Sequence, residues 1–188
     1  MKTIVYVDGF SFYYGCLRST YLKDSVCRSV DLVSLFRDCL LPSSSGVVSQ
    51  LLRMNYFTSQ NGYGVLLSEN PLLQVWQLEE KQADVRLGLE FLHDALSGEV
   101  EQLVLCSSDA DLLPALQVVR DRRPDCRLGL VVPSMDKPRK VHPELLRLTD
   151  WCRAVVYQDE LAACTTKTRG QRASVARFTA GQRSASPA

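Results

Sequence analysis

The sequence predicts an α/β fold in three layers, in which helices cover both faces of a mainly parallel central sheet. Two observations predict it. Short apolar runs alternate with segments of helical periodicity, which is typical of βαβ units. These runs are apolar at consecutive positions, as expected for strands that are buried on both faces. The length of 188 residues is enough for one such domain with its own core.

The N-terminal segment opens this alternation. Residues 3–7 (TIVYV) form an apolar run, which predicts a strand that ends at Asp8. Residues 11–17 are rich in aromatic side chains and are predicted to begin a helix. Residues 31–40 have helical periodicity and stop before Pro42, which cannot continue a helix. A strand followed by helical segments is therefore the expected first unit.

The middle of the chain is expected to add a second strand and two helices. Residues 42–46 (PSSSG) and 61–64 (NGYG) have the composition of a loop and a flexible turn. Between them, residues 47–57 are predicted to form a strand. Residues 71–78 are expected to be helical. Residues 82–96 predict a longer helix because their apolar positions recur at helical spacing.

The last part of the domain repeats the pattern. Apolar runs at residues 102–106 and 126–132 predict two more buried strands. Helices are expected at residues 110–120 and 143–148. Residues 154–157 are predicted to form a last short strand.

Composition divides the chain into a predicted domain, residues 1–164, and a basic tail, residues 165–188, which is expected to be disordered because it has few large apolar residues. The formal net charge is only +1, so the whole chain is not strongly basic. Its distribution is uneven, because residues 161–188 contain five cations and no acid. Such a tail either attracts a polyanion or is simply solvated.

The cysteines and the N-terminal residues predict the cellular compartment of the protein. None of the seven cysteines forms a C-x-x-C pair, and with two histidines in the chain a zinc site is not expected. The opening MKTIVYVDGF contains too short an apolar run for a signal peptide, and no later run approaches membrane-spanning length. A cytoplasmic protein that does not insert into membranes is expected.

Three aspartates follow predicted strands. Asp8 ends the first strand, and Asp109 and Asp111 come shortly after residues 102–106. Function in parallel sheets gathers beyond the carboxyl ends of the strands, where these side chains meet if the two strands are neighbours. The alternative is local: Asp8 forms a turn, and Asp109 or a neighbouring serine caps the next helix.

The position of Asp84 helps to distinguish a shared site from purely local turn and cap roles. On a helical wheel of residues 82–96 it falls between Phe91 and Ala95, in the middle of the apolar arc. Burying a lone carboxylate costs several kcal/mol unless it is paired. Its partner is either Lys81, three residues earlier, or a cation shared with the strand-end aspartates.

A bound cation would explain why several carboxylates are expected to converge at one site. Several converging acids repel one another and raise their own pKa values, and a hard divalent ion such as Mg²⁺ or Mn²⁺ removes that repulsion. The chemistry then available is attack of metal-activated water on a phosphodiester. His93 and His142 have no evident nucleophile as a partner, and the sequence contains no G-x-x-x-x-G-K-[ST] phosphate loop.

Three stretches carry a resemblance to a known family. They are IVYVDGFSFYYG, EKQADVRLGLEFL and LVLCSSDADLLPAL. In this order and spacing they resemble the NYN domain of the PIN-like nuclease superfamily, which includes the LabA-like proteins. The resemblance spans about residues 2–160. It implies a Rossmann-like parallel sheet and divalent-metal-dependent cleavage of RNA.

The resemblance also implies roles for single residues. Asp8, Asp84 and Asp109 become the catalytic metal ligands, Asp111 assists them, and Lys81 becomes a phosphate or carboxylate partner. Two positions depart from the family pattern: Ser11 stands where the family has Asn, and Ser108 replaces the Gly of S-G-D. These departures leave the acids intact but put turnover in question.

The expected partner is RNA, most naturally single-stranded. Further contacts with it are predicted from Arg53, Arg139 and Tyr13, besides Ser11 and Ser108. The predicted function is a metal-dependent ribonuclease. The alternative is a catalytically weak or inactive module of the same fold that binds RNA or protein. A phosphatase or receiver-like domain is disfavoured, because a phosphatase of this type needs a second aspartate where Tyr6 stands.

Overall fold

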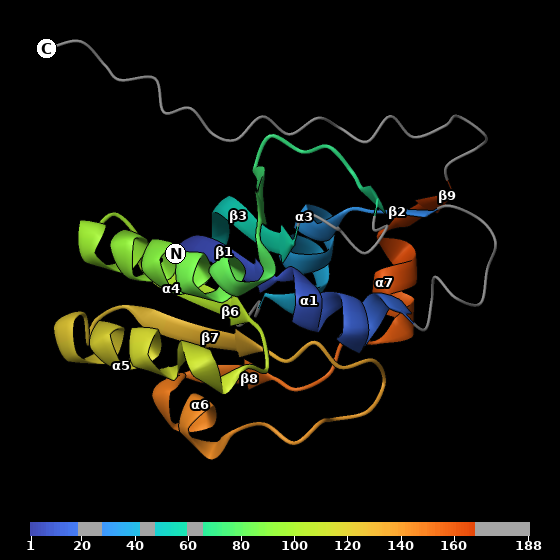
Figure 1. Cartoon of the computed structure of the whole chain (residues 1–188). Coiled ribbons are helices and arrows are strands. Elements are labelled where there is room, and N and C mark those ends of the chain that lie inside the picture. The colour runs from blue at the N-terminus through green and yellow to red at the C-terminus, as the bar shows by residue number, and fades with distance from the viewer. Residues whose placement is uncertain (19–27, 42–47, 60–65, 168–188) are drawn as a thin grey trace, which may run out of the picture.

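A six-stranded parallel sheet lies at the centre of the protein (Figure 1). The computed structural model describes residues 1–18, 28–41, 48–59 and 66–167. The strand order is β5-β3-β1-β6-β7-β8. The strands are β1 (Lys2–Asp8), β3 (Gln50–Ser59), β5 (Leu73–Leu78), β6 (Gln102–Cys106), β7 (Arg127–Val131) and β8 (Trp151–Arg153).

Helices cover both faces of this sheet. One layer contains α4 (Glu80–Ser97), η3 (Ala110–Leu112), α5 (Leu113–Arg122) and α6 (Pro143–Leu148). The other contains α1 (Gly9–Phe12), the π-helical turns η1 (Tyr13–Leu17) and η2 (Leu35–Leu40), α3 (Leu32–Ser34) and α7 (Gln158–Ala163). The expected three-layer α/β fold is confirmed.

The central strand β1 supplies both cores, because successive side chains of a strand point to opposite faces. Val5 and Val7 pack with the layer of α1 and η1, whereas Ile4 and Tyr6 pack with the layer of α4 and α5. All four are almost completely buried. Consecutive apolar residues in β1 therefore report a strand buried on both faces, as predicted.

The order of the strands reverses beside β1. The chain runs from β1 outward to β3 and β5, then returns through α4 to β6 on the other side of β1. Val7 of β1 pairs with Cys106 of β6, so both strands end at the same level. Ligands of open parallel sheets bind at such a reversal, outside the carboxyl ends of the strands.

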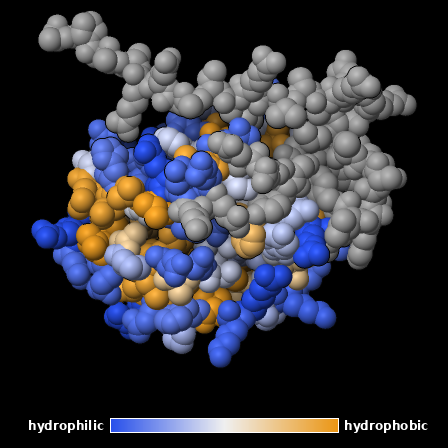
Figure 2. All heavy atoms as spheres, viewed as in Figure 1, coloured by the Kyte–Doolittle hydropathy of each residue, from blue (hydrophilic) through white to orange (hydrophobic). Residues whose placement is uncertain are grey.

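The outer face of the α4–α5 layer is partly apolar, and Figure 2 shows hydrophobic residues gathered over these two helices. Val85, Leu89 and Leu96 of α4 and Val118 of α5 are exposed. Apolar side chains therefore extend over more of the circumference of α4 than its packing against the sheet requires.

The predicted helix at residues 71–78 is wrong, because residues 73–78 form the edge strand β5. Trp76 pairs with Phe57 of β3 in parallel register, and their rings stack with centroids 5.9 Å apart. The backbone of this segment is satisfied by β3, a partner that lies more than a dozen residues earlier in the chain. A short apolar run does not reveal such a partner.

The C-terminal predictions need two smaller corrections. The last strand of the sheet is β8 at 151–153, and Val156 of the predicted strand makes only an isolated bridge with Met135. Thr165–Lys167, the start of the predicted tail, form β9, which pairs antiparallel with β2 (Arg28–Val30). With β4 (Leu66–Leu67) these strands make a small second sheet.

Some predictions fall outside the described residues. They are the loop at 42–46, the turn at 61–64 and the tail beyond residue 167. Among the helices that are described, none is both long enough and apolar enough to cross a lipid bilayer.

Candidate functional site

Asp8 ends β1 and is held in one orientation by its surroundings. The side chain is 6% exposed. Its Oδ1 accepts the backbone N–H groups of Phe10 and Ser11 at 3.0 and 3.1 Å, so that it caps the start of α1. Its Oδ2 accepts the hydroxyl of Ser107 at 2.8 Å. Three hydrogen bonds thus fix a carboxylate at the carboxyl end of the central strand.

Ser107 connects the two strand ends, and its role was not predicted. It is the first residue after β6 and is fully buried. Its Oγ donates to Asp8 and also accepts the backbone N–H of Asp109 at 3.0 Å. No sequence signal identified it, because the register that places Ser107 level with Asp8 is set only when β1 and β6 pair.

Asp109 and Asp111 follow Ser107 in the same turn. Asp109 caps η3, and its Oδ1 accepts the N–H of Asp111 at 2.9 Å. The local interpretation of Asp109 as a helix cap is therefore confirmed, whereas Asp8, which was expected to form a turn, caps α1. It does not exclude a shared site, because the two capping carboxylates are also joined through Ser107.

Asp84, in α4, lies within electrostatic range of these carboxylates. Burial is the largest effect on its pKa, which rises to about 6, and the negative charges of Asp8, Asp109 and Asp111 raise it further in that order. An electrostatic effect of this kind requires the four carboxylates to lie near one another. The structure therefore brings together the four acids that the sequence singled out, and we call them the acidic cluster.

The acidic cluster fits a divalent cation in charge and in donor atoms, because hard cations prefer carboxylate oxygens. In the described part of the chain, however, no three acidic, histidine or cysteine side chains stand close enough together to ligate one ion. Both oxygens of Asp8 already accept hydrogen bonds. An ion would have to share Asp8 Oδ2 with Ser107 and draw Asp84 and Asp109 inward, so the ligand set stays a prediction.

The prediction for Arg53 is wrong. It lies in the middle of β3, level with Ile4 of β1, and not at the carboxyl end where Asp8 lies. Its guanidinium forms an ion pair with Asp94 of α4, which also accepts the hydroxyl of Tyr6. Arg53 therefore supports the packing of α4 on the sheet and does not reach the acidic cluster.

Tyr13 is not the ring best placed for a ligand. It is half-buried and packs against the core, with its ring edge-to-face against Tyr14 at 5.1 Å between centroids. The more exposed rings in this helix are Phe10 and Tyr14, at 50% and 38%. Phe10 was not predicted as a site residue, although its backbone N–H donates to Asp8.

The remaining predicted residues lie at the same edge of the sheet. Ser11 contributes its backbone N–H to Asp8, whereas Ser108 is half-buried beside Ser107. Arg139 is exposed in the loop that follows β7. Burial raises the pKa of the Cys16 thiol in η1 to about 12, and the nearby positive charge of Arg139 opposes that rise. The side chain of Lys81 lies outside the described residues, so its pairing with Asp84 stays a prediction.

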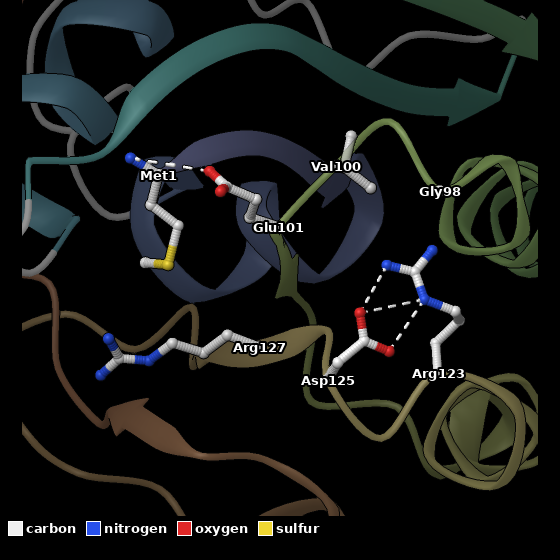
Figure 3. A pocket seen from close by; sticks show the side chains of 7 residues that line it. All are labelled: Met1, Gly98, Val100, Glu101, Arg123, Asp125 and Arg127. Atoms are coloured by element: carbon white, nitrogen blue, oxygen red, sulfur yellow. Dashed lines mark hydrogen bonds and ion pairs between the residues drawn. The ribbon is translucent and has the colours of Figure 1, made fainter.

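A separate hollow of about 640 Å³ opens at the opposite edge of the sheet, where β6 and β7 begin. Figure 3 shows Arg123 bound to Asp125, and the Met1 amino group directed at Glu101, while Arg127 extends away from the Arg123–Asp125 pair. Its charged groups are largely paired with one another. This hollow is therefore independent of the acidic cluster.

Comparison with known proteins places the chain in a family. No family model matches the sequence. The 6-hydroxy-3-succinoylpyridine 3-monooxygenase HspA of Pseudomonas putida (strain DSM 28022 / S16) is 31% identical over 223 aligned residues, which cover 87% of this chain and 70% of HspA. The chain belongs to the HspA family. HspA is named as an enzyme, so the family includes at least one protein to which catalysis is assigned.

A solved structure supports the fold of this HspA relative. The crystal structure of VPA0982, a protein of unknown function from Vibrio parahaemolyticus RIMD 2210633, matches with a TM-score of 0.53 at 17% identity. The match covers 85% of this chain and 94% of VPA0982. At this identity the likeness concerns the three-layer fold alone.

Proposed function

We propose that this protein is a metal-dependent ribonuclease of the NYN type, which hydrolyses RNA phosphodiester bonds at the acidic cluster. The observation that carries the proposal is the position of Asp84, whose half-buried carboxylate lies within electrostatic range of Asp8, Asp109 and Asp111. The last three extend from the ends of two adjacent parallel strands. Four anions at this position favour a divalent cation and a phosphate-bearing substrate.

The acids of the cluster differ in how they are held in place. Asp8 is fixed by Phe10, Ser11 and Ser107 and supplies a rigid anion. Asp109 is positioned through its backbone by Ser107. Asp84 comes from a different part of the fold, the first turns of α4. When bound, the cation would neutralise charge on the phosphate and activate the attacking water.

The carboxylate of Asp84 is also suited to a proton-transfer role. Burial, followed by the three neighbouring aspartates, raises its pKa to about 6, which is closer to neutral pH than an ordinary aspartate. A carboxylate with a pKa near the working pH is a better general base than one that titrates near 4. This pKa belongs to the protein without a cation, and a bound cation would lower it, so Asp84 would then serve as a ligand; both roles need its carboxylate.

The test is cleavage of a labelled single-stranded RNA of mixed sequence in Mn²⁺ or Mg²⁺, with EDTA as the blank. Asp109→Asn keeps the cap geometry but removes one negative charge, and cleavage should fall on the order of 100-fold or more. Asp121→Asn is the matched control, because Asp121 is exposed near the far end of α5. Equal cleavage by the wild type and Asp109→Asn would contradict the proposal. RNA binding without turnover would favour a regulatory module.

The relationship to HspA supports a second candidate function. HspA is named a monooxygenase of a succinoylpyridine, and the two chains share 31% identity. We therefore also propose hydroxylation of a pyridine ring as the alternative activity. The discriminating assay incubates the protein with 6-hydroxy-3-succinoylpyridine, oxygen and a two-electron reductant, and follows product by mass. Because C3 of this substrate carries the succinoyl group, oxygenation at C3 breaks the bond from C3 to that group, and protein-dependent formation of a dihydroxypyridine with release of the side chain would favour this candidate over RNA cleavage.

A further inference from the structure

An apolar stripe runs along the outer side of α4. Val85, Leu89, Leu92 and Leu96 follow one another at steps of four, three and four residues. Val85, Leu89 and Leu96 are 63%, 59% and 52% exposed, whereas Leu92 is half-buried. Such steps place side chains in one row along a helix, as in helices that pack against another helix. The side of α4 that packs on the sheet uses a different row, which includes Phe91.

The neighbouring helix α5 carries a stripe with the same steps. It consists of Asp111, in η3, followed by Ala115, Val118 and Arg122. Val118 is 38% exposed and Ala115 is half-buried, whereas both charged ends are exposed. In the part of the chain that the structure describes, neither Asp111 nor Arg122 is held in an ion pair. The α5 stripe thus begins with an unpaired acid, ends with an unpaired base and is apolar between them.

The two stripes lie side by side, with their midpoints at about the same level. A Cβ placed on Gly88 of α4 would be 3.7 Å from the Cβ of Ala115, so the two helices contact each other there. The midpoint of the α4 stripe falls between Leu89 and Leu92, and that of the α5 stripe between Ala115 and Val118. Both helices run in the same direction, because the strands that they connect are parallel. Each midpoint therefore lies one to three residues beyond the Gly88–Ala115 contact.

The apolar residues of the two stripes form one surface, and Figure 2 shows hydrophobic residues gathered over these helices. We call it the α4–α5 face, and its members are Val85, Leu89, Leu92, Leu96, Ala115 and Val118. Charged residues are depleted at the centre of protein–protein interfaces and stand at their rim. The α4–α5 face has this arrangement along α5, where the charges stand only at the two ends of the stripe.

We infer that two copies of this chain form a dimer by packing their α4–α5 faces against each other about a twofold axis. The axis lies in the plane of the face and crosses both helices at the level of the two midpoints. Each helix then packs antiparallel to the same helix of the second copy. Leu89 lies opposite Leu92 of the second copy, and Asp111 lies opposite Arg122 of the second copy.

The order of charges along α5 identifies the partner as a second copy. In the antiparallel arrangement the symmetry forms the Asp111–Arg122 pair twice, once at each end of the interface. A twofold axis parallel to the helices would instead pack α4 against α5 of the second copy and would leave these charges unpaired. An unrelated partner would have to supply a base and an acid at the same separation, which a copy of the chain supplies by symmetry.

The available area fits a reversible dimer. With 18 residues α4 is about 27 Å long at 1.5 Å per residue, and neighbouring helices pack roughly 8–10 Å apart. The face therefore covers on the order of 500 Å² per copy, or about 1,000 Å² in total, which is the lower limit for a specific interface. A dissociation constant in the micromolar range is expected.

The dimer would also bring a charge to the acidic cluster. Because Asp111 is a member of that cluster, Arg122 of the second copy would lie at its edge. A guanidinium there would offset part of the negative charge of the cluster. The inference itself does not depend on the proposed ribonuclease function, since it rests on the surface of α4 and α5.

The first experiment is sedimentation velocity of the whole chain at concentrations from the nanomolar to the high micromolar range. The wild type should shift from monomer to dimer as the concentration rises. Leu89→Glu places a charge at the centre of the interface twice and should raise the dissociation constant on the order of 100-fold. Val48→Glu is the matched control, because Val48 is 81% exposed and precedes β3, outside the α4–α5 layer. It should dimerise as the wild type does.

The second experiment tests the antiparallel arrangement by reversing charges. Asp111→Arg and Arg122→Glu each turn two attractive pairs into two repulsive ones, and each should weaken dimerisation about 5- to 30-fold. An equal mixture of the two variants restores both attractive pairs in the heterodimer. The mixture should therefore dimerise about as tightly as the wild type. This result does not require any variant in the apolar centre to fold.

Each outcome decides the inference. A wild type that stays monomeric at every concentration would overturn it, and so would a dimer that persists unchanged in Leu89→Glu. Circular dichroism shows whether Leu89→Glu remains folded, and if it does not, the charge-reversed mixture decides. A mixture that dimerises no better than its two components would refute the antiparallel twofold arrangement. Loss of the dimer in Leu89→Glu together with its recovery in the mixture would support it, whether or not the protein cleaves RNA.

Discussion

Asp84→Asn removes one negative charge from the acidic cluster and leaves the shape of the side chain almost unchanged. In the folded protein the pKa of Asp84 rises from 3.8 to about 6, first because of burial and then because of the charges of Asp8, Asp109 and Asp111. A carboxyl with a raised pKa destabilises the folded state wherever it is ionised. Without metal, the variant should therefore be more stable than the wild type at neutral pH.

The magnitude follows from the shift. About two pKa units correspond to about 3 kcal/mol at 1.36 kcal/mol per unit. Asp84 is only half-buried, so solvent screening reduces this to roughly 1–2 kcal/mol. For a protein of this size that is a rise in Tm of roughly 3–6 °C. The difference is complete above the folded pKa of about 6 and fades as pH falls toward the unfolded value of 3.8.

The assay is thermal unfolding followed by circular dichroism in EDTA, at pH 7.5 and again at pH 4. Asp121→Asn is the control, because it removes a charge from an exposed position that accepts a hydrogen bond from Gln117 and has no place in the acidic cluster. A second series adds Mn²⁺. A ligand at 100 times its Kd stabilises the folded state by about 2.7 kcal/mol, and Asp84→Asn should lose most of this gain.

Two results would refute this reasoning. A gain in stability of Asp84→Asn that is the same at pH 4 as at pH 7.5 would show that charge repulsion is not its cause. An equal stabilisation of the wild type and Asp84→Asn by Mn²⁺ would show that the ion binds elsewhere. Either outcome would remove the physical basis for a cation at the acidic cluster.

Two substitutions test the framework of the site. Ser107→Ala removes the hydroxyl that donates to Asp8, and leaving a buried carboxylate oxygen without its donor should cost about 1–3 kcal/mol, measured as a lower midpoint in urea. Gly15→Ala would place a Cβ 1.8 Å from the carbonyl oxygen of Pro133 and should destabilise by at least 1–3 kcal/mol. Gly88→Ala meets only ordinary contacts at 3.7 Å, so unchanged or slightly higher stability is expected, and an equal loss in both glycine variants would contradict the steric explanation.

The local sequence pattern was sufficient to predict the buried central strands of this protein. The strands β1, β6 and β7 were predicted because their residues are apolar at consecutive positions, and a strand covered on both faces needs that pattern in its own sequence. Asp8 and Asp109 were predicted as strand-end residues for the same reason. Asp84 was predicted to face the sheet because helical periodicity alone determines which side of α4 it occupies.

Tertiary structure decided everything that depends on a partner distant in the chain. Residues 73–78 became a strand because β3 satisfies their backbone, and Arg53 turned to Asp94 because α4 crosses β3 at that level. Ser107 met Asp8 because the parallel register of β1 and β6 aligned their ends. Which ring of the first helix stays at the surface was decided in the same way. A sequence pattern records which face of an element is buried, but the residue that lies opposite is determined only when the elements pack.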